Sequence, residues 1–333
     1  MRFLKRLLAV ILVLVIIYFL GPHPSNPVYN TSLTEVPSAD TSLEKYIGQQ
    51  ESQHKIKPNN EARIVWANDS LKQKTEYAIV YLHGFSASQE EGNPVHRNIA
   101  KQFGCNLYLS RLSQHGIDTT DALYNMTADN LWESAKQAYA IGTQLGKKVI
   151  LMGTSTGGTL VLQLAAEYPE IAGLILYSPN ISINDPNAWL LNNPWGLQIA
   201  RLVKKSDFNT AKNNSPEYKQ YWNYQYRLEA TVQLQELLET AMNANTFSKV
   251  KQPTLTLYYY KDEQHQDAVV KVAAMKEMMA GLGTPASQKK MVAIPEAGNH
   301  VLASPIQSKD IVRVEKETVV FMKEILHLQP VQH

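Results

Sequence analysis

Short apolar runs alternate with amphipathic stretches along most of this 333-residue chain. Runs rich in β-branched and aromatic residues predict strands over 62–66, 77–82, 106–109, 148–153, 172–178, 254–260 and 290–295. Apolar residues at helical spacing predict helices over 131–145, 159–168, 269–282 and 311–328. We expect the first of these helices to stop at Gly146 and the last to have Ser308 as its N-cap. Strands that alternate with helices predict an α/β fold, with a mostly parallel sheet and helices on both faces.

Residues 179–250 interrupt the alternation, because they contain no clear strand. Helical runs such as 228–242 predict that this segment is a helical cap inserted over one end of the sheet. Its aromatic residues either bury the cap against the body or line a substrate pocket, and a cap can do both. These residues are Trp189, Trp195, Tyr218, Tyr221, Trp222, Tyr224 and Tyr226.

The N-terminus has a different pattern, in which Arg2, Lys5 and Arg6 precede an unbroken apolar run over 7–20. Fourteen residues form a helix of about 21 Å, shorter than a bilayer core of about 30 Å, although snorkelling basic side chains extend the span. A secretory signal peptide has a similar length, but no small-x-small cleavage site follows the run. We therefore predict an uncleaved membrane anchor over 1–21, in preference to a cleaved signal or a buried core helix. The basic flank predicts a cytoplasmic N-terminus with the body on the other side, or a secreted body if the segment is cleaved.

Residues 22–60 are rich in Pro, Ser, Asn and Gln, which predicts a linker and lead-in with a short helix near 43–50. The composition, 44% hydrophobic and 19% charged, is that of a globular protein large enough to bury one sizeable core. The formal net charge is +2 without a basic block in the body, so we expect no nucleic-acid partner. Cys105 is the single cysteine, which excludes an intramolecular disulfide, and its apolar neighbours predict a buried structural thiol.

The segment GTSTGG (153–158) lies directly between the predicted strand 148–153 and the predicted helix 159–168. In this position G-x-S-x-G predicts a tight strand-to-helix turn that exposes Ser155 at the carboxyl edge of the sheet. The free amides and the positive dipole end of the following helix point to the same place. We interpret Ser155 as a nucleophile; the alternative is a plain turn rich in glycine and serine.

A serine hydroxyl needs a base before it can attack at neutral pH. His300 follows the predicted strand 290–295 in a loop at the same sheet edge as Ser155, where the ligand and catalytic groups of open α/β sheets collect. We therefore predict that His300 is the base.

The base needs an acid to fix its tautomer, and the loop after 254–260 offers Asp262, Glu263 and Asp267. We favour Asp267, which stands directly before the next predicted helix, while Asp262 lies closer to the strand end. The same segment, DEQHQD, lacks the central glycine of a calcium loop, so we expect no metal and no other cofactor.

Acyl transfer also needs hydrogen-bond donors for the developing oxyanion. The backbone N–H of Thr156, directly after Ser155, is one candidate. The loop His83-Gly84-Phe85 follows the strand 77–82, and the backbone N–H of Phe85 is the other. His83 precedes the serine in the chain, so we expect it to orient this loop and not to act as the base.

Five motifs together resemble the α/β-hydrolase superfamily, most of all its branch of monoacylglycerol lipases and serine aminopeptidase-like hydrolases. In chain order they are YLHGF (81–85), RLSQHG (111–116), GTSTGG (153–158), DAVV (267–270) and PEAGNHV (295–301). The resemblance covers about residues 61–328. It implies an α/β-hydrolase domain over 61–330 with a helical cap at about 179–250. It departs from the family at GTSTG, where G-H-S-M/L-G is usual, and at RLSQHG, whose Arg111 and His115 we expect to be structural.

The resemblance assigns roles to five residues: nucleophile Ser155, acid Asp267, base His300, and oxyanion donors Phe85 and Thr156. We therefore predict a membrane-anchored serine hydrolase that cleaves a carboxylic ester or lipid-like small molecule through an acyl-enzyme. One alternative is a peptidase or amidase on the same triad, which would need an acidic or other polar group in the cap to bind a substrate amine, and no obvious candidate stands out. Another is a membrane-tethered binding module without catalytic activity.

Overall fold

Within residues 2–38 and 41–331, which the computed structural model describes, seven strands form the central sheet, and each overlaps a predicted apolar run. They are β1 (Arg63–Val65), β2 (Thr75–Leu82), β3 (Asn106–Leu109), β4 (Gly146–Thr154), β5 (Gly173–Tyr177), β8 (Thr254–Tyr258) and β9 (Lys289–Ala293). The strand order is β1-β3-β2-β4-β5-β8-β9, and every neighbouring pair is parallel except β1 with β3. The prediction of a mostly parallel α/β sheet is confirmed.

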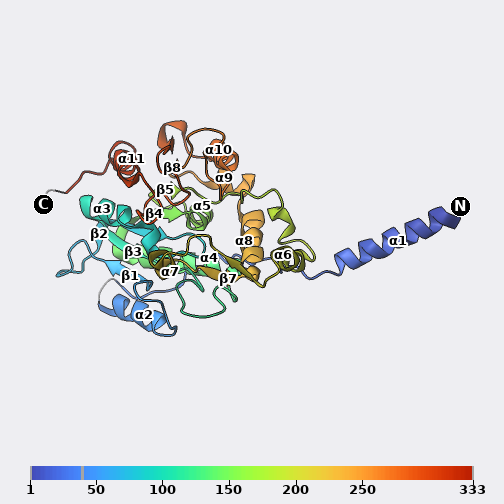
Figure 1. Cartoon of the computed structure of the whole chain (residues 1–333). Helices are drawn as coiled ribbons and strands as arrows, with labels where there is room; N and C mark the ends of the chain where they lie inside the picture. The colour runs from blue at the N-terminus through green and yellow to red at the C-terminus, as the bar shows by residue number, and fades with distance from the viewer. Residues whose placement is uncertain (1, 39–40, 332–333) are drawn as a thin grey trace.

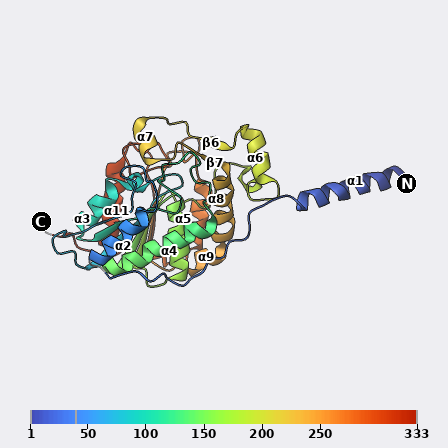
Figure 2. The same ribbon diagram turned by 90° about the horizontal axis from the view of Figure 1, so that it is seen from below.

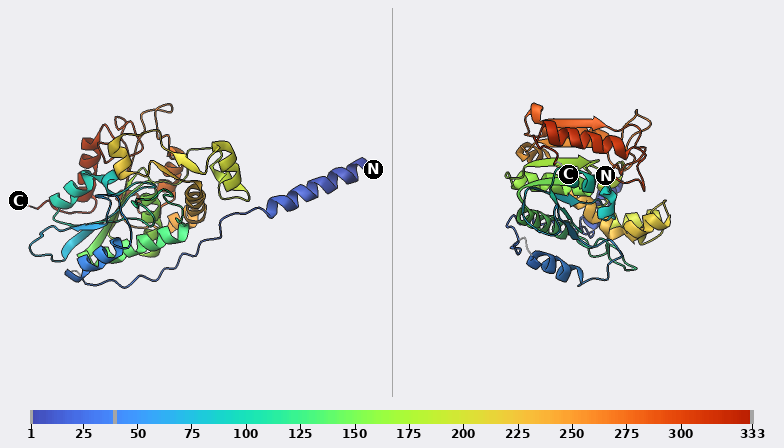
Figure 3. Two further views of the ribbon diagram at one scale, coloured as in Figure 1. Left: turned by 60° about the horizontal axis from the view of Figure 1, so that its bottom comes forward. Right: turned by 90° about the vertical axis from the view of Figure 1, so that its left-hand side faces the viewer.

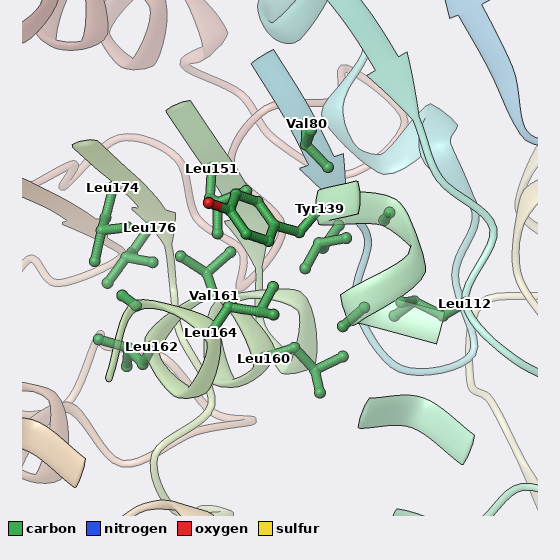
Figure 4. Close-up of a cluster of buried hydrophobic side chains, with 14 of the residues drawn as sticks. Val80, Leu112, Tyr139, Leu151, Leu160, Val161, Leu162, Leu164, Leu174 and Leu176 are labelled. Carbon is green, nitrogen blue, oxygen red and sulfur yellow. The ribbon is translucent and has the colours of Figure 1, made fainter. Parts of the chain in front are cut away.

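Helices cover both faces of this sheet. Successive residues of a strand point to opposite faces, so each strand contributes side chains to both cores. Val80 and Leu151 pack into the core on the side of α4 and α5, and Ile79 and Ile150 pack on the side of α3 and α11. Figure 4 shows the first of these two cores. The helices of the body are α2 (Thr41–Glu51), α3 (Val95–Gln102), α4 (Ala128–Leu145), α5 (Thr156–Glu167), α10 (Val272–Gly281) and α11 (Ile311–Glu324), with short 3₁₀ turns η1 (Gln89–Gly92) and η3 (Ala286–Gln288).

Two helix ends test the predicted stop and cap. Gly146 follows the last residue of α4 and begins β4, so the predicted stop is confirmed. The predicted cap Ser308 is wrong, because the side chain of Asp310 accepts the hydrogen bond from the Arg313 amide at the start of α11. Ser308 instead accepts a hydrogen bond from the backbone N–H of Asp310.

Cys105 is a buried free thiol, as expected, and burial raises its pKa to about 12.

The chain between β5 and β8 forms a largely helical layer. Its elements are η2 (Ala188–Leu190), α6 (Gly196–Lys204), β6 (Phe208–Thr210), α7 (Pro216–Tyr221), β7 (Gln225–Arg227), α8 (Leu228–Ala241) and α9 (Ala244–Lys249). Figure 2 shows α6, α7 and the β6–β7 pair along one side of the molecule. The expectation of a segment without strands is wrong, because β6 and β7 pair antiparallel. Each strand has three residues, too few for a periodic pattern to reveal.

Residues 22–38, part of the segment expected to be a linker, lie along the body beside α4 (Figure 3, left). Three of their carbonyl groups accept hydrogen bonds from body side chains: Trp132 Nε1 to Asn30 at 2.7 Å, Tyr168 Oη to Thr31 at 2.6 Å and Lys136 Nζ to Ser32 at 2.9 Å. Trp132 and Lys136 are buried. This part of the lead-in therefore completes the hydrogen bonding of α4 and is packed against it.

The N-terminal helix α1 (Arg2–Phe19) extends away from the body and buries none of its residues (Figure 1). In the part of the chain that the structure describes, we find no helix with both the length and the apolar character needed to cross a bilayer. Arg2, Lys5 and Arg6 occupy the start of the helix and leave residues 7–19, about 20 Å, against a bilayer core of about 30 Å. The predicted membrane anchor over 1–21, with the membrane orientation derived from it, is therefore wrong.

Candidate active site

Ser155 lies at the turn from β4 into α5, with φ 52° and ψ −118°. This left-handed backbone is unfavourable for a residue with a side chain, and the neighbouring glycines make it sterically feasible. A Cβ on Gly153 would lie 2.6 Å from the carbonyl carbon of Gly157, and a Cβ on Gly157 would overlap the carbonyl oxygen of Leu82. The backbone N–H of Ser155 donates to Tyr177 O on β5 at 2.9 Å. The tight strand-to-helix turn predicted from G-x-S-x-G is therefore present.

His300 and Asp267 form a buried pair. His300 Nδ1 lies 2.6 Å from Asp267 Oδ2, while Asp267 Oδ1 accepts from the backbone N–H groups of Val269 at 2.8 Å and Val270 at 3.1 Å. Burial alone would raise the pKa of Asp267, but the His300 charge, its hydrogen bond and the two amides outweigh burial and lower it. Burial alone would lower the pKa of His300, but the charge and hydrogen bond of Asp267 outweigh burial and raise it. The pair therefore favours a charged imidazolium.

The other two acids of the loop are directed elsewhere. Asp262 is exposed and accepts from His265 Nδ1 at 2.8 Å, and Glu263 accepts from the Tyr260 hydroxyl at 2.8 Å. The backbone N–H of Asp267 donates to Tyr259 O at 3.1 Å, which brings the end of this loop back to the end of β8. Of the three candidate acids, Asp267 is the one that contacts His300.

A cavity of about 950 Å³ lies between the sheet edge and the layer from β5 to β8. Ser155, His300 and Phe85 line it from the sheet side. His300 Nε2 is buried and has no hydrogen-bond partner within the described residues. The opposite wall is mostly apolar and includes Leu190, Leu191, Ile199, Val203, Leu228 and Leu234. The structure thus brings the predicted serine and histidine to one largely apolar cavity.

The aromatic residues of the inserted segment serve both of the expected purposes. Tyr218, Trp222 and Tyr226 line the cavity, and Trp222 is also buried. Trp189 is exposed, whereas Trp195 Nε1 donates to Ile17 O at the end of α1 at 3.0 Å.

The two predicted oxyanion donors come from different elements, the loop after β2 and the start of α5. Thr156 is the first residue of α5, so its backbone N–H is one of the helix amides without an intrahelical acceptor, at the positive end of the dipole. Phe85 is half-buried in the loop after β2, and its ring packs edge-on against Tyr226 with centroids 5.0 Å apart. Among the residues described, no hydrogen-bond acceptor is found for the backbone N–H of Phe85.

The buried histidines beside this loop have structural contacts. His83 accepts from the Leu112 amide at Nε2, 3.0 Å, so its Nδ1 donates to Gly84 O at 2.9 Å. Burial lowers the pKa of His83, and it lowers the pKa of His115 to about 4, so both are neutral at physiological pH. Arg111 Nε pairs with Glu51 at 2.8 Å. These contacts fit the structural roles expected for His83, Arg111 and His115.

Glu91 is a cavity residue that the sequence analysis missed. It follows the HGF motif within η1, is buried, and lines the same cavity as Ser155 and His300. The sequence SQEEG contains two adjacent acids, of which Glu91 is buried and Glu90 is not. Nothing in the sequence tells the two apart, so it gave no signal of this position.

Comparison with known proteins places the chain among enzymes of one fold. Residues 78–302 match a family described as "Serine aminopeptidase, S33". A curated relative, the thermostable monoacylglycerol lipase of Bacillus sp. (strain H-257), is 29% identical over 105 residues, which span 32% of this chain and 41% of that lipase. The chain therefore aligns with less than half the length of this relative.

Two solved structures show the same fold at low sequence identity. One comes from work on LipS and LipT, two metagenome-derived lipolytic enzymes, with a TM-score of 0.65 and 18% identity over 81% of this chain and 99% of the other. The second is the monoacylglycerol lipase of Paleococcus ferrophilus, with a TM-score of 0.57 and 14% identity over 79% of this chain and 98% of the other. With the sheet order above, these matches confirm the predicted α/β-hydrolase fold and the resemblance on which it rested.

Proposed function

We propose, because this chain belongs to the serine aminopeptidase S33 family of α/β hydrolases, that it is a serine hydrolase that cleaves carboxylic esters through an acyl-enzyme. The observation that carries the proposal is the buried His300–Asp267 pair at 2.6 Å, with His300 and Ser155 lining one cavity. The described relative and the first solved structure are lipolytic enzymes by name, which supports an ester as the substrate.

In the proposed first step, Ser155 Oγ attacks the ester carbonyl and His300 Nε2 takes its proton. Asp267 holds Nδ1–H, which fixes the tautomer, and its negative charge stabilises the imidazolium that forms. The alcohol then leaves with the proton returned by His300. Water, activated by the same imidazole, hydrolyses the acyl-Ser155 and releases the acid.

The proposed oxyanion donors are the backbone N–H groups of Phe85 and Thr156. Their support is local: Thr156 offers a free helix amide, and the Phe85 amide is not used within the described chain. A loop amide and a helix amide beside the nucleophile can converge on one oxygen as it becomes negative.

The shape of the cavity favours an acyl chain as the group bound by the layer above the sheet. Aliphatic side chains such as Leu191, Val203 and Leu234 would bury a hydrocarbon tail. An amidase or peptidase remains the competing proposal, since Asp185 lines the cavity from that layer and could bind a substrate amine. Asp185 is exposed and already accepts the Asn187 amide at 2.8 Å, which favours the ester.

The test compares the wild-type chain with Ser155→Ala on p-nitrophenyl esters of increasing chain length and on aminoacyl p-nitroanilides. We expect ester hydrolysis and fluorophosphonate labelling by the wild type, and loss of both in Ser155→Ala. Ser113→Ala, outside the cavity, is the control and should behave as the wild type. Labelling that persists in Ser155→Ala contradicts the nucleophile, and faster turnover of the anilides favours the amidase.

A further inference from the structure

Glu91 is a buried acid next to the proposed nucleophile, and no step of the proposed mechanism uses it. Its Oε2 accepts a hydrogen bond from the backbone N–H of Gly84 at 2.5 Å. The side chain thus returns from η1 to the start of the loop that contains Phe85. Only 2% of Glu91 is exposed, so this contact is made away from solvent.

We propose that Glu91 is a positioning residue of the active site: its carboxylate holds the Gly84 amide and sets the loop that presents the Phe85 N–H toward Ser155 and His300. The inference rests on the proposed function, because the loop and the histidine matter in this way only if Ser155 forms an acyl-enzyme.

The first line of support is the close packing of Gly84 between Glu91 and Ser155. A Cβ on Gly84 would lie 2.9 Å from both carboxylate oxygens of Glu91 and 3.1 Å from Ser155 Cβ. The loop therefore passes between Glu91 and Ser155 with no room for a side chain at Gly84. Because Glu91 uses the Gly84 amide, the next amide in the loop, that of Phe85, is the one left to bind an oxyanion.

The second line of support is the way the loop is closed. The Ala87 amide donates to Gly84 O at 3.3 Å, and the Glu91 amide donates to Ser88 O at 3.2 Å. These backbone turns bring Glu91 back beside Gly84, so that its side chain closes the loop at the point where the loop leaves β2. The resulting loop is held at both ends.

The third line of support is the link to the layer above the sheet. Trp222 packs with Ala87 and Val301, and its side chain lowers the pKa of Glu91. The backbone N–H of Asn223 donates to Ser86 O at 2.7 Å. Glu91 therefore lies where three parts of the site meet: the oxyanion loop, the segment after α7 and the loop that contains His300.

The charge of Glu91 acts on His300 as well. Burial raises the pKa of Glu91 to about 7, against the lowering effects of the Gly84 amide and the His300 charge. In return, Glu91 contributes to the raised pKa of His300. Tyr81 on β2 and Tyr218 on α7 also face Glu91, but the pKa of Tyr218 is raised to about 12 and that of Tyr81 lies well above its usual range. The two tyrosines are therefore neutral at physiological pH, and His300 is the neighbour whose charge interacts with that of Glu91.

The experiment measures p-nitrophenyl butyrate hydrolysis from pH 5 to 9 by the full chain, as wild type, Glu91→Ala, Glu91→Gln and Glu90→Gln. Glu90 is the matched control, because it is half-exposed and pairs with Asn93 at 2.6 Å. We expect kcat to fall about tenfold or more in Glu91→Ala with KM within about twofold, since a misplaced loop weakens transition-state binding. Glu91→Gln keeps an acceptor for Gly84 and should restore part of kcat.

The pH profile separates positioning from simple structural support. Glu91→Gln removes a negative charge near His300, so the acid limb of kcat/KM should move to lower pH than in the wild type. Glu90→Gln should leave the limb unchanged. An acid limb that does not move in Glu91→Gln, or a wild-type kcat in Glu91→Ala, overturns the inference while leaving an active wild type. A wild type that neither hydrolyses esters nor reacts with fluorophosphonate overturns the proposed function itself.

Discussion

Asp267 and Asp262 lie five residues apart in one loop, yet they have different neighbours. Asp267 is buried against His300, and Asp262 is exposed beside His265. We expect Asp267→Asn to lower kcat by about 10⁴-fold, the loss typical of a triad acid, because it removes the charge that stabilises the imidazolium. Asp262→Asn should stay within about twofold of the wild type. Ester turnover of the two variants is the measurement, and equal losses would contradict the assignment of the acid.

Glu91 also has a predicted effect on stability. Its pKa is raised from 4.5 to about 7 in the folded state, so the folded protein binds its proton more tightly than the unfolded chain does. The stability contributed by the protonated acid is complete below about pH 4.5 and is lost as the pH rises through 7. At about 1.4 kcal/mol per pKa unit, the loss is on the order of 3 kcal/mol.

Glu91→Gln lacks this titration, so its Tm should rise relative to the wild type between pH 5 and pH 8. Thermal unfolding of the two proteins at both pH values tests this. A difference in Tm that is the same at pH 5 and pH 8 would exclude a titrating Glu91.

Single residues could be predicted from sequence where a motif fixes their place on the sheet. Ser155 directly follows β4 and His300 lies in the loop after β9, and parallel strands bring their carboxyl ends to one edge. Glu91 could not be predicted in this way, because its position depends on the turns that bring the side chain back to Gly84. The neighbouring Glu90 has the same local sequence and a half-exposed side chain.

At the level of elements, the β4–α5 turn makes a specific prediction about glycine. A Cβ at Gly157 would overlap the carbonyl oxygen of Leu82, so Gly157→Ala must move β2 or α5. We expect a loss of about 100-fold in kcat and about 2 kcal/mol in the free energy of unfolding. Gly48→Ala in α2 is the control, because a Cβ there meets no atom within 4 Å and alanine is the better helix former. Denaturant unfolding and ester assays of both variants test this prediction. A fully active Gly157→Ala would contradict the close approach of Gly157 to the Leu82 carbonyl.

Elements with many apolar residues in a regular pattern could be predicted from the sequence, and short elements without such a pattern could not. The buried strands β4 and β5 and the helix α5 were clear from sequence because the fold buries nearly every residue they contain. The strands β6 and β7 are short and partly polar, and they are defined by pairing with each other. The sequence offers two residues that commonly cap helices, Ser308 and Asp310, and only the path of the chain shows that Asp310 is the N-cap of α11.

At the level of the whole molecule, the lead-in before α2 should matter more for stability than α1. Removing residues 1–36 would take away the carbonyl acceptors of the buried Trp132 N–H and Lys136 ammonium, and would leave Glu133 as the partner of Lys136. A buried donor without its acceptor costs about 1–3 kcal/mol. We expect Tm to fall by about 5 °C or more in this deletion. Removing residues 1–21 takes away a helix with no buried residue and should change Tm by less than about 2 °C. Differential scanning calorimetry of both deletions tests this, and equal Tm values would contradict it.

Composition alone predicted a linker for the lead-in, because Pro, Ser and Asn are typical of loops. What ties it to the body is a series of backbone carbonyls, which every residue possesses whatever its side chain. The acceptors therefore left no trace in the sequence, although the donors Trp132 and Lys136 lie in a helix that was predicted.

The hydrogen bond from the Asn223 amide to Ser86 O bears on how such enzymes diversify. Exchanging the inserted segment for that of a homologue is an obvious way to change chain-length preference. In this chain the exchange would also replace the residue whose amide holds the loop beside the proposed nucleophile. A chimera that retains Trp222 and Asn223 from the parent keeps that contact and can vary the apolar wall independently. Exchanges confined to residues before α7 or after β7 are therefore expected to be tolerated better than exchanges that replace the chain from α7 to β7.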